Sequence, residues 1–327
     1  MKYLYVLVSN TKDYYSEQAF ISIYSLKLKT PNAFVSLLVD DLTSEYLKNN
    51  FQELLKSVHE VKVIELDSKY SNKEKSRILK TTMRQHIDGD FLFIDCDTVI
   101  CEDLSEIEKC ECDIGCVLDN HVKIDKHWCK DFFITNAKKC GFEESILSNT
   151  HFNSGVIYCK DNPKTHNFFA QWYSLWNKTK EKGIIIDQTS FNQVNAVENW
   201  HIKELDGKWN CQIINGGCKF LANAKIIHYF ATLNPIFGNP YLIDDKNIFE
   251  EIKAKHFITE SVKDMLDNPR NLIDCNSTLL GSTIPRGMLY FGSLFHLVYL
   301  YKKSKFLYKC FSFILGKLYR FINYIAL

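Results

Sequence analysis

The sequence predicts an α/β fold in which a mainly parallel central sheet is flanked by helices. Over the first 100 residues, apolar runs of strand length alternate with segments whose apolar residues recur at helical spacing. The apolar runs are also continuous, which is typical of parallel strands that are buried on both faces. A chain of 327 residues with 46% hydrophobic and 24% charged residues is ordinary for a globular enzyme.

The predicted elements follow one another in βαβ order. We expect strands at 3–8 (YLYVLV), 34–39 (FVSLLV), 61–66 (VKVIEL) and 91–95 (FLFID). Helices are expected between them, because Ala19, Ile23 and Leu26 share one helical face and Leu47, Phe51, Leu54 and Leu55 share another. A Lys/Arg-rich helix should precede the fourth strand. Further strands are expected near 113–118, 155–159 and 225–229.

The chain divides into a predicted domain at 1–258, a polar, turn-rich linker at 259–287 and a basic, aromatic tail at 288–327. Seven basic residues and no acidic one follow Asp274. The longest apolar stretch, 288–301, is shorter than the roughly 20 residues of a membrane-spanning helix. Lysines among aromatic residues favour a helix that lies on an anionic membrane surface. A helix pair packed on the core, or a nucleic-acid contact, are the alternatives.

Cysteine usage and the N-terminus both indicate a reducing, cytoplasmic setting. The opening MKYLYVLVSN has too short an apolar core for a signal peptide and no small-residue cleavage site. The 12 cysteines then act as small core residues. A zinc site at Cys101, Cys110, Cys112 and Cys116 is disfavoured, because their spacing is not the paired pattern of such sites.

Two carboxylates, Asp95 and Asp97, follow the fourth predicted strand, with Cys96 between them. In parallel sheets, ligands bind beyond the carboxyl ends of the strands. Two carboxylates there can share Mg²⁺ or Mn²⁺, which usually also binds substrate phosphates. Alone, the pair favours a turn in which Asp97 caps the next segment and Asp95 pairs with a lysine.

The motifs around this pair carry a family resemblance. In order along the chain they are SRILKTTMRQHIDGD (76–90), the Asp-Cys-Asp motif, HFNSGVIYCK (151–160), IIIDQTSFNQV (184–194), KWN (208–210) and KIIHYF (225–230). Together they resemble family 8 glycosyltransferases over about residues 1–235. The resemblance implies a GT-A fold, which is Rossmann-like, and a retaining, metal-dependent transfer from a UDP-sugar. Bacterial galactosyl- and glucosyltransferases of lipooligosaccharide synthesis belong to this family.

The resemblance implies a metal site made by Asp95, Asp97 and His228, which would hold Mn²⁺ or Mg²⁺ against the UDP diphosphate. A neutral imidazole suits a site that already holds two carboxylates. The alternative for His228 is a core histidine at a strand end. Cys96 occupies the middle of the motif, and we expect its side chain to point away from the metal.

The resemblance also implies a set of donor-binding residues. Arg77, or its rival Lys80, would contact phosphate or sugar oxygens, although both also fit an exposed basic helix face. Asp187 and Gln188 would lie against the reacting sugar and, with Arg77, carry the catalysis. The remaining donor contacts are expected at Asn153, Ser154 and less securely Asp119 for the sugar, and at Val8, Ser9, Asn10 and Tyr14 or Tyr15 for uracil and ribose.

The expected function is transfer of galactose or glucose from a UDP-sugar to a glycan or lipid-linked acceptor in bacterial surface polysaccharide synthesis, on the inner face of the cytoplasmic membrane. The sequence YFATLNPIFGNP after His228 lacks the lysine that commonly contacts phosphate in this family. A non-catalytic homologue that binds a sugar nucleotide or a membrane is the first alternative. A nucleotidyltransferase is the second, although residues 9–15 contain no glycine for a phosphate loop.

Overall fold

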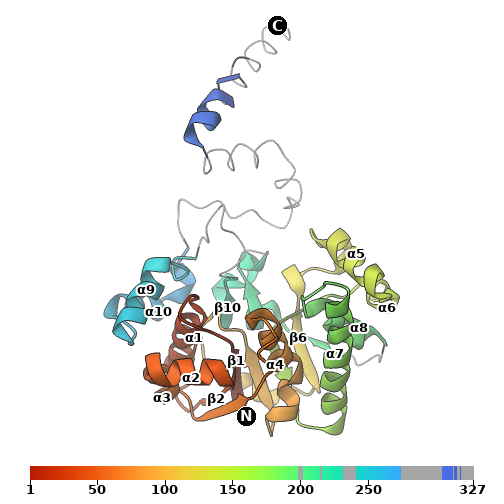
Figure 1. Ribbon diagram of the computed structural model, residues 1–327, viewed down its shortest axis with the longest axis horizontal. Coiled ribbons are helices and arrows are strands. Elements are labelled where there is room, and N and C mark those ends of the chain that lie inside the picture. The colour runs from red at the N-terminus through yellow and green to blue at the C-terminus, as the bar shows by residue number, and fades with distance from the viewer. Residues whose placement is uncertain are drawn as a thin grey trace.

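The computed structural model describes residues 1–197, 202–213, 216–230, 241–273, 304–311, 313, 314 and 317. Its centre is a seven-stranded sheet in the order β3-β2-β1-β4-β7-β6-β8 (Figure 1). Only β7 runs against the other strands of this sheet, because it pairs antiparallel with both β4 and β6. The prediction of an α/β fold with a mainly parallel sheet is therefore confirmed.

The strands lie close to their predicted positions. Those of the large sheet are β1 (Lys2–Leu7), β2 (Phe34–Asp40), β3 (Glu60–Ile64), β4 (Phe91–Ile94), β6 (Ile114–Leu118), β7 (Phe152–Cys159) and β8 (Lys203–Glu204). A small second sheet, in the order β5-β10-β9, consists of β5 (Thr98–Ile100), β9 (Cys211–Gln212) and β10 (Ile226–His228).

Helices lie between and around these strands. They are α1 (Tyr15–Lys29), α2 (Asp41–Asn50), α3 (Gln52–Lys56), α4 (Asn72–His86), α5 (Lys130–Cys140), α6 (Glu143–Leu147), α7 (Pro163–Glu181), α8 (Gln188–Val197), α9 (Lys246–Lys255) and α10 (Glu260–Asp267). The predicted helix around 47–55 is divided at Phe51, whose backbone leaves the helical region (φ −150°, ψ 56°) and gives α2 and α3.

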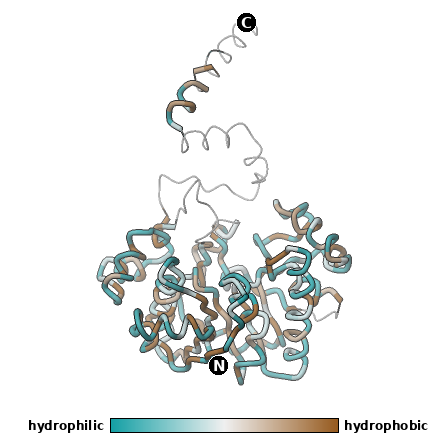
Figure 2. The backbone as a smooth tube through the Cα atoms, viewed as in Figure 1, coloured by the Kyte–Doolittle hydropathy of each residue, from teal (hydrophilic) through white to brown (hydrophobic). Residues whose placement is uncertain are grey.

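The large sheet is buried on both faces, as the continuous apolar runs predict. Along β1, Tyr3, Tyr5 and Leu7 enter one core, whereas Leu4 and Val8 enter the other. Apolar residues of α1, α9 and α10 cover the first core, and those of α4, α7 and α8 cover the second. Hydrophobic residues accordingly concentrate along the strands, and the outer helices contain both hydrophilic and hydrophobic residues (Figure 2).

Local capping signals fix where three of the helices begin. Ser71 and Glu74 form a reciprocal capping box at the start of α4, and Asn162 and Thr165 form one at the start of α7. Asp40 caps α2 by accepting a hydrogen bond from the Thr43 amide. These caps satisfy amide groups that have no partner inside the helix.

The small sheet places the C-terminal part of the domain against the end of β4. Strand β10 pairs antiparallel with β5, in a register that sets His228 opposite Thr98. The Tyr229 amide also donates to the Asp97 carbonyl at 3.1 Å. This pairing explains how residues 130 positions apart in the chain come together, which the sequence pattern alone does not indicate.

The predicted boundary at 258 and the predicted tail remain predictions. Helix α10 lies at the start of the predicted linker, and its Val262 and Leu266 are fully buried in the core, so folded structure continues into that segment. Most of the tail lies outside the described residues, although 305–311 are helical. Among the helices that the structure describes, none is both long and apolar enough to cross a membrane.

Candidate active site

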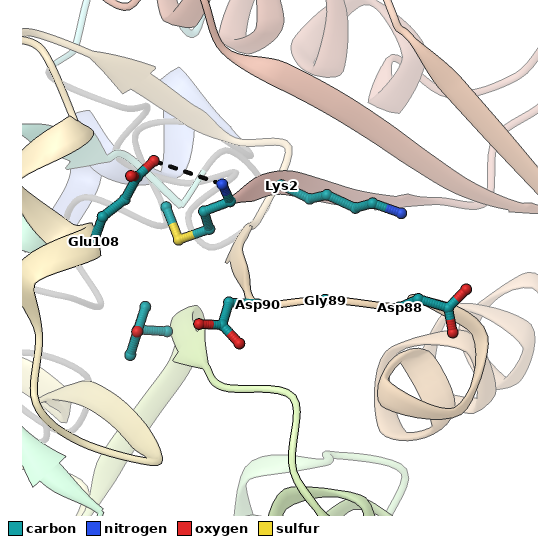
Figure 3. A pocket seen from close by; sticks show the side chains of 7 residues that line it. Lys2, Asp88, Gly89, Asp90 and Glu108 are labelled. Carbon is teal, nitrogen blue, oxygen red and sulfur yellow. Dashed lines mark ion pairs between the residues drawn. The ribbon is translucent and has the colours of Figure 1, made fainter.

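Two cavities lie at opposite ends of the central strands. One, of about 320 Å³, is at the carboxyl ends of β1 and β4, where Val6, Leu7 and Val8 meet Asp95, Cys96 and Asp97; its other lining residues are Tyr15, Gln18, Asn72, Lys73, Ser76 and Arg77. The second, of about 480 Å³, is lined by Met1, Lys2, Asp88, Gly89, Asp90, Glu108 and Tyr158. It is at the amino ends of the same strands (Figure 3). Because ligands of open α/β sheets bind at the carboxyl ends, the first cavity is the candidate active site.

The sheet pairings bring Asp95, Asp97 and His228 together at this cavity. One potential ligand atom from each lies within 4.8 Å of the others, and these three form the only such group of acidic, histidine or cysteine side chains in the described part of the chain. His228 Nε2 is 3.2 Å from Asp97 Oδ1. Two carboxylates and one imidazole are a donor set that Mn²⁺ or Mg²⁺ accepts, so the residues present fit a divalent cation.

The two carboxylates of the cluster have different electrostatic surroundings. Burial raises the pKa of Asp95, against the opposing charge of Lys80. Burial also disfavours the charged form of Asp97, but the neighbouring His228 outweighs it and lowers the pKa. Lys80 Nζ lies 3.2 Å from both oxygens of Asp95, which is the lysine pair of the turn alternative. That alternative does not account for His228, which comes from a different sheet.

Helix α4 supplies two cations to the site. Arg77 Nε is 2.8 Å from Asp187 Oδ1, and Lys80 Nζ is 3.7 Å from Asp187 Oδ2. Although burial opposes ionisation of Asp187, these two cations lower its pKa, and Asp187 in turn raises the pKa of Arg77. Lys80 is buried and Arg77 is half-exposed in the cavity wall, so neither belongs to a plain exposed helix face.

The predicted sugar-binding residues form a hydrogen-bonded group beside the cluster. Ser154 Oγ donates to Asp187 Oδ2 at 2.9 Å, and Asn153 Nδ2 donates to Asp119 Oδ1 at 2.7 Å. They reach the site because β7 runs antiparallel to β4, which sets the start of β7 beside the end of β4. The Asp95 amide correspondingly donates to the Gly155 carbonyl at 2.8 Å.

Two residues of this group have no predicted role. His127 Nε2 lies 2.9 Å from Asp119 Oδ2. Asn210, which is fully buried, bonds both Asn153 Oδ1 at 2.9 Å and His228 Nδ1 at 3.0 Å. The KWN motif contains Asn210, but a lone buried asparagine gives no sequence signal of what it contacts.

Of the residues after β1 that were predicted to bind uracil and ribose, only some line the cavity. Val8 lines the cavity, whereas the Ser9 hydroxyl and the Asn10 amide both bond to Asp13. Of the two candidate stacking residues, Tyr15 lines the cavity. Tyr14 instead packs on Phe249 and donates to Glu250. The structure therefore favours Tyr15 over Tyr14.

Three further expectations concern Cys96, Gln188 and the missing lysine. Cys96 Sγ lies 3.5 Å from the Val6 carbonyl and packs against the core, and Cys96 also lines the cavity, so the expectation that its sulfur points away from the metal stays a prediction. Gln188 is half-buried at the start of α8, directly after Asp187. Residues 231–240, which lack the lysine that commonly contacts phosphate in the family, lie outside the described residues.

Several solved structures that share this fold are glycosyltransferases. LgtC, described as a galactosyltransferase in complex with donor and acceptor sugar analogues, matches with a TM-score of 0.51 and 13% identity over 81% of this chain and 99% of that chain. WbbM, a bifunctional glycosyltransferase, matches with a TM-score of 0.52 and 17% identity over 79% of this chain, which spans 52% of that protein. At these identities the likeness shows the fold alone.

The sequence comparison identifies the family. Among curated proteins, no sequence matches the chain significantly. The model of glycosyl transferase family 8 matches residues 6–235, a range that contains every predicted site residue and more than half of the chain. Enzymes of this family with the GT-A fold typically depend on a divalent metal, in keeping with the Asp-Asp-His group. The chain therefore belongs to glycosyl transferase family 8 and is a glycosyltransferase of the GT-A fold.

Proposed function

We propose that the protein transfers galactose or glucose from the corresponding UDP-sugar to a glycan or lipid-linked acceptor, with retention of configuration and with Mn²⁺ as the preferred metal. The observation that carries the proposal is the convergence of Asp95, Asp97 and His228 at the cavity beyond β1 and β4. LgtC, a structural neighbour, is described with donor and acceptor sugar analogues. Its description supports a sugar donor of the same kind here.

In this proposal Asp95, Asp97 and His228 hold the cation. The bound cation supplies Lewis-acid stabilisation of a diphosphate leaving group. Arg77 lines the cavity beside these carboxylates and offers its terminal guanidinium nitrogens to phosphate oxygens, on which negative charge develops. Asp187 holds Arg77 in this orientation through the Nε contact.

The transfer breaks the bond between the anomeric carbon and the diphosphate oxygen, with its electron pair left on the diphosphate. The acceptor hydroxyl oxygen forms the new bond to the same carbon, and its proton passes to the departing diphosphate. We favour attack from the front side over a double displacement through an enzyme carboxylate. Asp187 is already paired with Arg77 and Lys80, so positioning the sugar suits it better than nucleophilic attack.

The C-terminal segment supports an acceptor at a membrane surface. In the helical residues 305–311, Lys305 and Lys309 are exposed, and so are Phe306 (74% exposed) and Phe311 (49%). Exposed aromatic side chains together with lysines favour the interface of an anionic membrane. A lipid-linked acceptor in surface polysaccharide synthesis lies at such an interface.

The donor proposal is tested by measuring UDP release from a panel of UDP-sugars, with and without Mn²⁺. The expected result is Mn²⁺-dependent release from UDP-galactose or UDP-glucose that Asp97→Ala reduces by at least about 10²-fold. Glu45→Ala, an exposed carboxylate of α2, is the matched control and should leave release unchanged. If UDP binds but no sugar is released or transferred, the protein is a non-catalytic homologue; if UDP does not bind, the proposal is wrong.

The membrane proposal is tested by deleting residues 288–327 and measuring sedimentation with phosphatidylserine vesicles. The full chain should sediment with these vesicles at low salt, and the shortened chain should stay in the supernatant while it retains UDP release. Neutral phosphatidylcholine vesicles are the control. Equal sedimentation of both chains would contradict the membrane proposal.

A further inference from the structure

Asn210 connects the sugar-binding side of the site to the metal cluster. It belongs to a short 3₁₀ segment at Gly207–Asn210, directly before β9, and its side chain is fully buried. One end of its amide faces Asn153 and the other faces His228. Which end is oxygen and which is nitrogen can be worked out from the groups around it.

The orientation of Asn153 is fixed from two directions. The Gly155 amide donates to Asn153 Oδ1 at 2.9 Å, and a backbone N–H has no acceptor capacity, so the atom that it faces must be the oxygen. On the other side, Asn153 Nδ2 faces Asp119 Oδ1 at 2.7 Å. Although burial opposes it, the His127 hydrogen bond lowers the pKa of Asp119 to about 2, so Asp119 is a carboxylate that only accepts.

The orientation of Asn210 follows from that of Asn153. Because Asn153 presents its oxygen, the Asn210 atom 2.9 Å away must be the donor, Nδ2. The remaining Asn210 atom, Oδ1, therefore faces His228 Nδ1 at 3.0 Å. An amide oxygen only accepts, so this contact is a hydrogen bond only when His228 carries a proton on Nδ1.

We propose that Asn210 is a positioning residue that holds neutral His228 as the Nδ1–H tautomer and thereby leaves Nε2 unprotonated as the metal-binding atom. The outer nitrogen of a metal-ligating histidine commonly donates to such a partner, which sets both the tautomer and the ring orientation. Here Nε2 faces Asp97 Oδ1 at 3.2 Å. In this tautomer two acceptor atoms face each other, an arrangement that a cation between them stabilises.

Two neighbours hold the plane of the His228 ring. The tautomer then determines whether Nε2 directs a lone pair or an N–H group toward Asp97. Phe230 stacks on the imidazole with a centroid distance of 4.0 Å. A Cβ at Gly155 would lie 2.4 Å from His228 Cε1, so the ring lies close against the β7 backbone. The inference that Nε2 binds a metal rests on the proposed function. The inference that Nδ1 carries the proton does not.

The tautomer is measured directly by long-range ¹H–¹⁵N correlation NMR of the full chain labelled with ¹⁵N-histidine. The His228 signals are assigned by their loss in His228→Gln, and the spectra are recorded without metal at alkaline pH. The expected pattern is a protonated Nδ1 and an unprotonated Nε2. An Nε2–H pattern in the wild-type protein overturns the proposal.

Three variants separate positioning from simple stability, with Mn²⁺ binding measured by electron paramagnetic resonance. Asn210→Leu removes the acceptor, and it should mix the two tautomers and weaken Mn²⁺ binding by about 10- to 100-fold. Asn210→Asp keeps an acceptor for Nδ1–H but replaces the Nδ2 donor to Asn153 by a second oxygen, so it should retain the tautomer, lose some stability and bind Mn²⁺ more tightly than Asn210→Leu does. Gln193→Leu, a buried amide that bonds Ser145 and Glu144 instead, is the control and should change neither readout.

These readouts separate failure of this inference from failure of the proposed function. If Asn210→Leu binds Mn²⁺ as well as wild type, or if Asn210→Asp fails as badly as Asn210→Leu while remaining folded, the positioning role is wrong and the metal site stands. If the wild-type protein does not bind Mn²⁺, the proposed function is wrong, and the NMR pattern still decides the tautomer.

Discussion

His228 shows how closely the residues of the site depend on one another. Its ring lies between Gly155 and Phe230, its Nδ1 contacts Asn210, and its Nε2 faces Asp97. On the other side of the carboxylate pair, Lys80 binds Asp95 and reaches Asp187, which also pairs with Arg77. Because these charged groups are close together and largely buried, removing one of them leaves its partner uncompensated and destabilises the site.

The spacing at Gly155 gives a first prediction. Gly155→Ala places a Cβ 2.4 Å from His228 Cε1, and β7 holds the backbone there, so the imidazole must move. We expect Mn²⁺ affinity, measured by calorimetry, to fall at least about tenfold. Gly115→Ala is the control, because its Cβ would press on the Leu205 side chain at 2.9 Å, away from the cluster. Equal losses in the two variants would contradict a specific effect on His228.

The geometry at Arg77 gives a second prediction. Arg77→Lys keeps a positive charge but loses the planar guanidinium, which bonds Asp187 through Nε and carries two further nitrogens that can donate. We expect kcat for UDP-sugar turnover to fall by about 10²-fold, at an unchanged unfolding temperature. Thr82→Ala, whose hydroxyl bonds only the Ile78 carbonyl among the described residues, is the control on the same helix. Wild-type turnover in Arg77→Lys would show that charge alone suffices.

At the scale of single elements, α4 is the helix that positions both cations of the site. Its apolar side chains Leu79 and Met83 pack in the second core, while Arg77 faces the cavity. The capping box of Ser71 and Glu74 fixes where this helix begins. The cap at the first turn therefore stabilises the helix that carries Arg77 and Lys80 into the site.

The capping box gives a third prediction. In Ser71→Ala the Glu74 amide loses the hydroxyl to which it donates. We expect the free energy of unfolding, measured with urea, to fall by about 1 kcal/mol. Ser71→Asp, which keeps an acceptor at this position, should remain close to wild type. An unchanged midpoint in Ser71→Ala would mean that packing alone holds the start of α4.

The order of the elements was predictable from the sequence, but the pairing of distant segments was not. The first four strands lie within about two residues of their predicted bounds, because long apolar runs are a strong local signal. The small sheet was missed as a unit: β5 and β9 have only three and two residues, too few for a periodic pattern. Helices α9 and α10 were also missed, in segments read as domain end and linker.

The site was predictable to the extent that its residues belong to motifs. Asp95, Asp97 and His228 converge as the resemblance implied, and Asn153 and Asp187 lie beside them. Asn210 and His127 were missed because neither side chain carries a sequence signal for its partners, which are Asn153 and His228 for Asn210 and Asp119 for His127. Choosing between Tyr14 and Tyr15 depends on knowing that α1 begins at Tyr15. Sequence patterns locate the start of a helix only to within a few residues.

At the scale of the whole molecule, a buried acid makes stability depend on pH. Glu17 is fully buried in α1, and neither of its carboxyl oxygens has a hydrogen-bond partner among the described residues. Burial raises its pKa from 4.5 to about 7. The folded protein therefore binds this proton more tightly than the unfolded chain does, so the group favours folding below pH 4.5, and this contribution is lost as the pH rises through about 7.

This linkage gives a fourth prediction. Glu17→Gln removes the charge, so the variant should be more stable than wild type at pH 8, by up to about 3 kcal/mol. The advantage should shrink to near zero at a pH below the ordinary glutamate pKa, where both side chains are neutral. Urea unfolding of both proteins across this range measures the difference. A stability difference that does not change with pH would show that the ionisation of Glu17 is not its cause.

The central claim is that Asp95, Asp97 and His228 together hold the divalent cation that supports transfer from a UDP-sugar. It is tested most directly by crystallising the protein with Mn²⁺ and UDP and locating manganese from its anomalous diffraction. The account predicts one manganese peak within coordination distance of all three side chains and of both UDP phosphates. A manganese peak elsewhere, or UDP bound with no manganese at these residues, would contradict it.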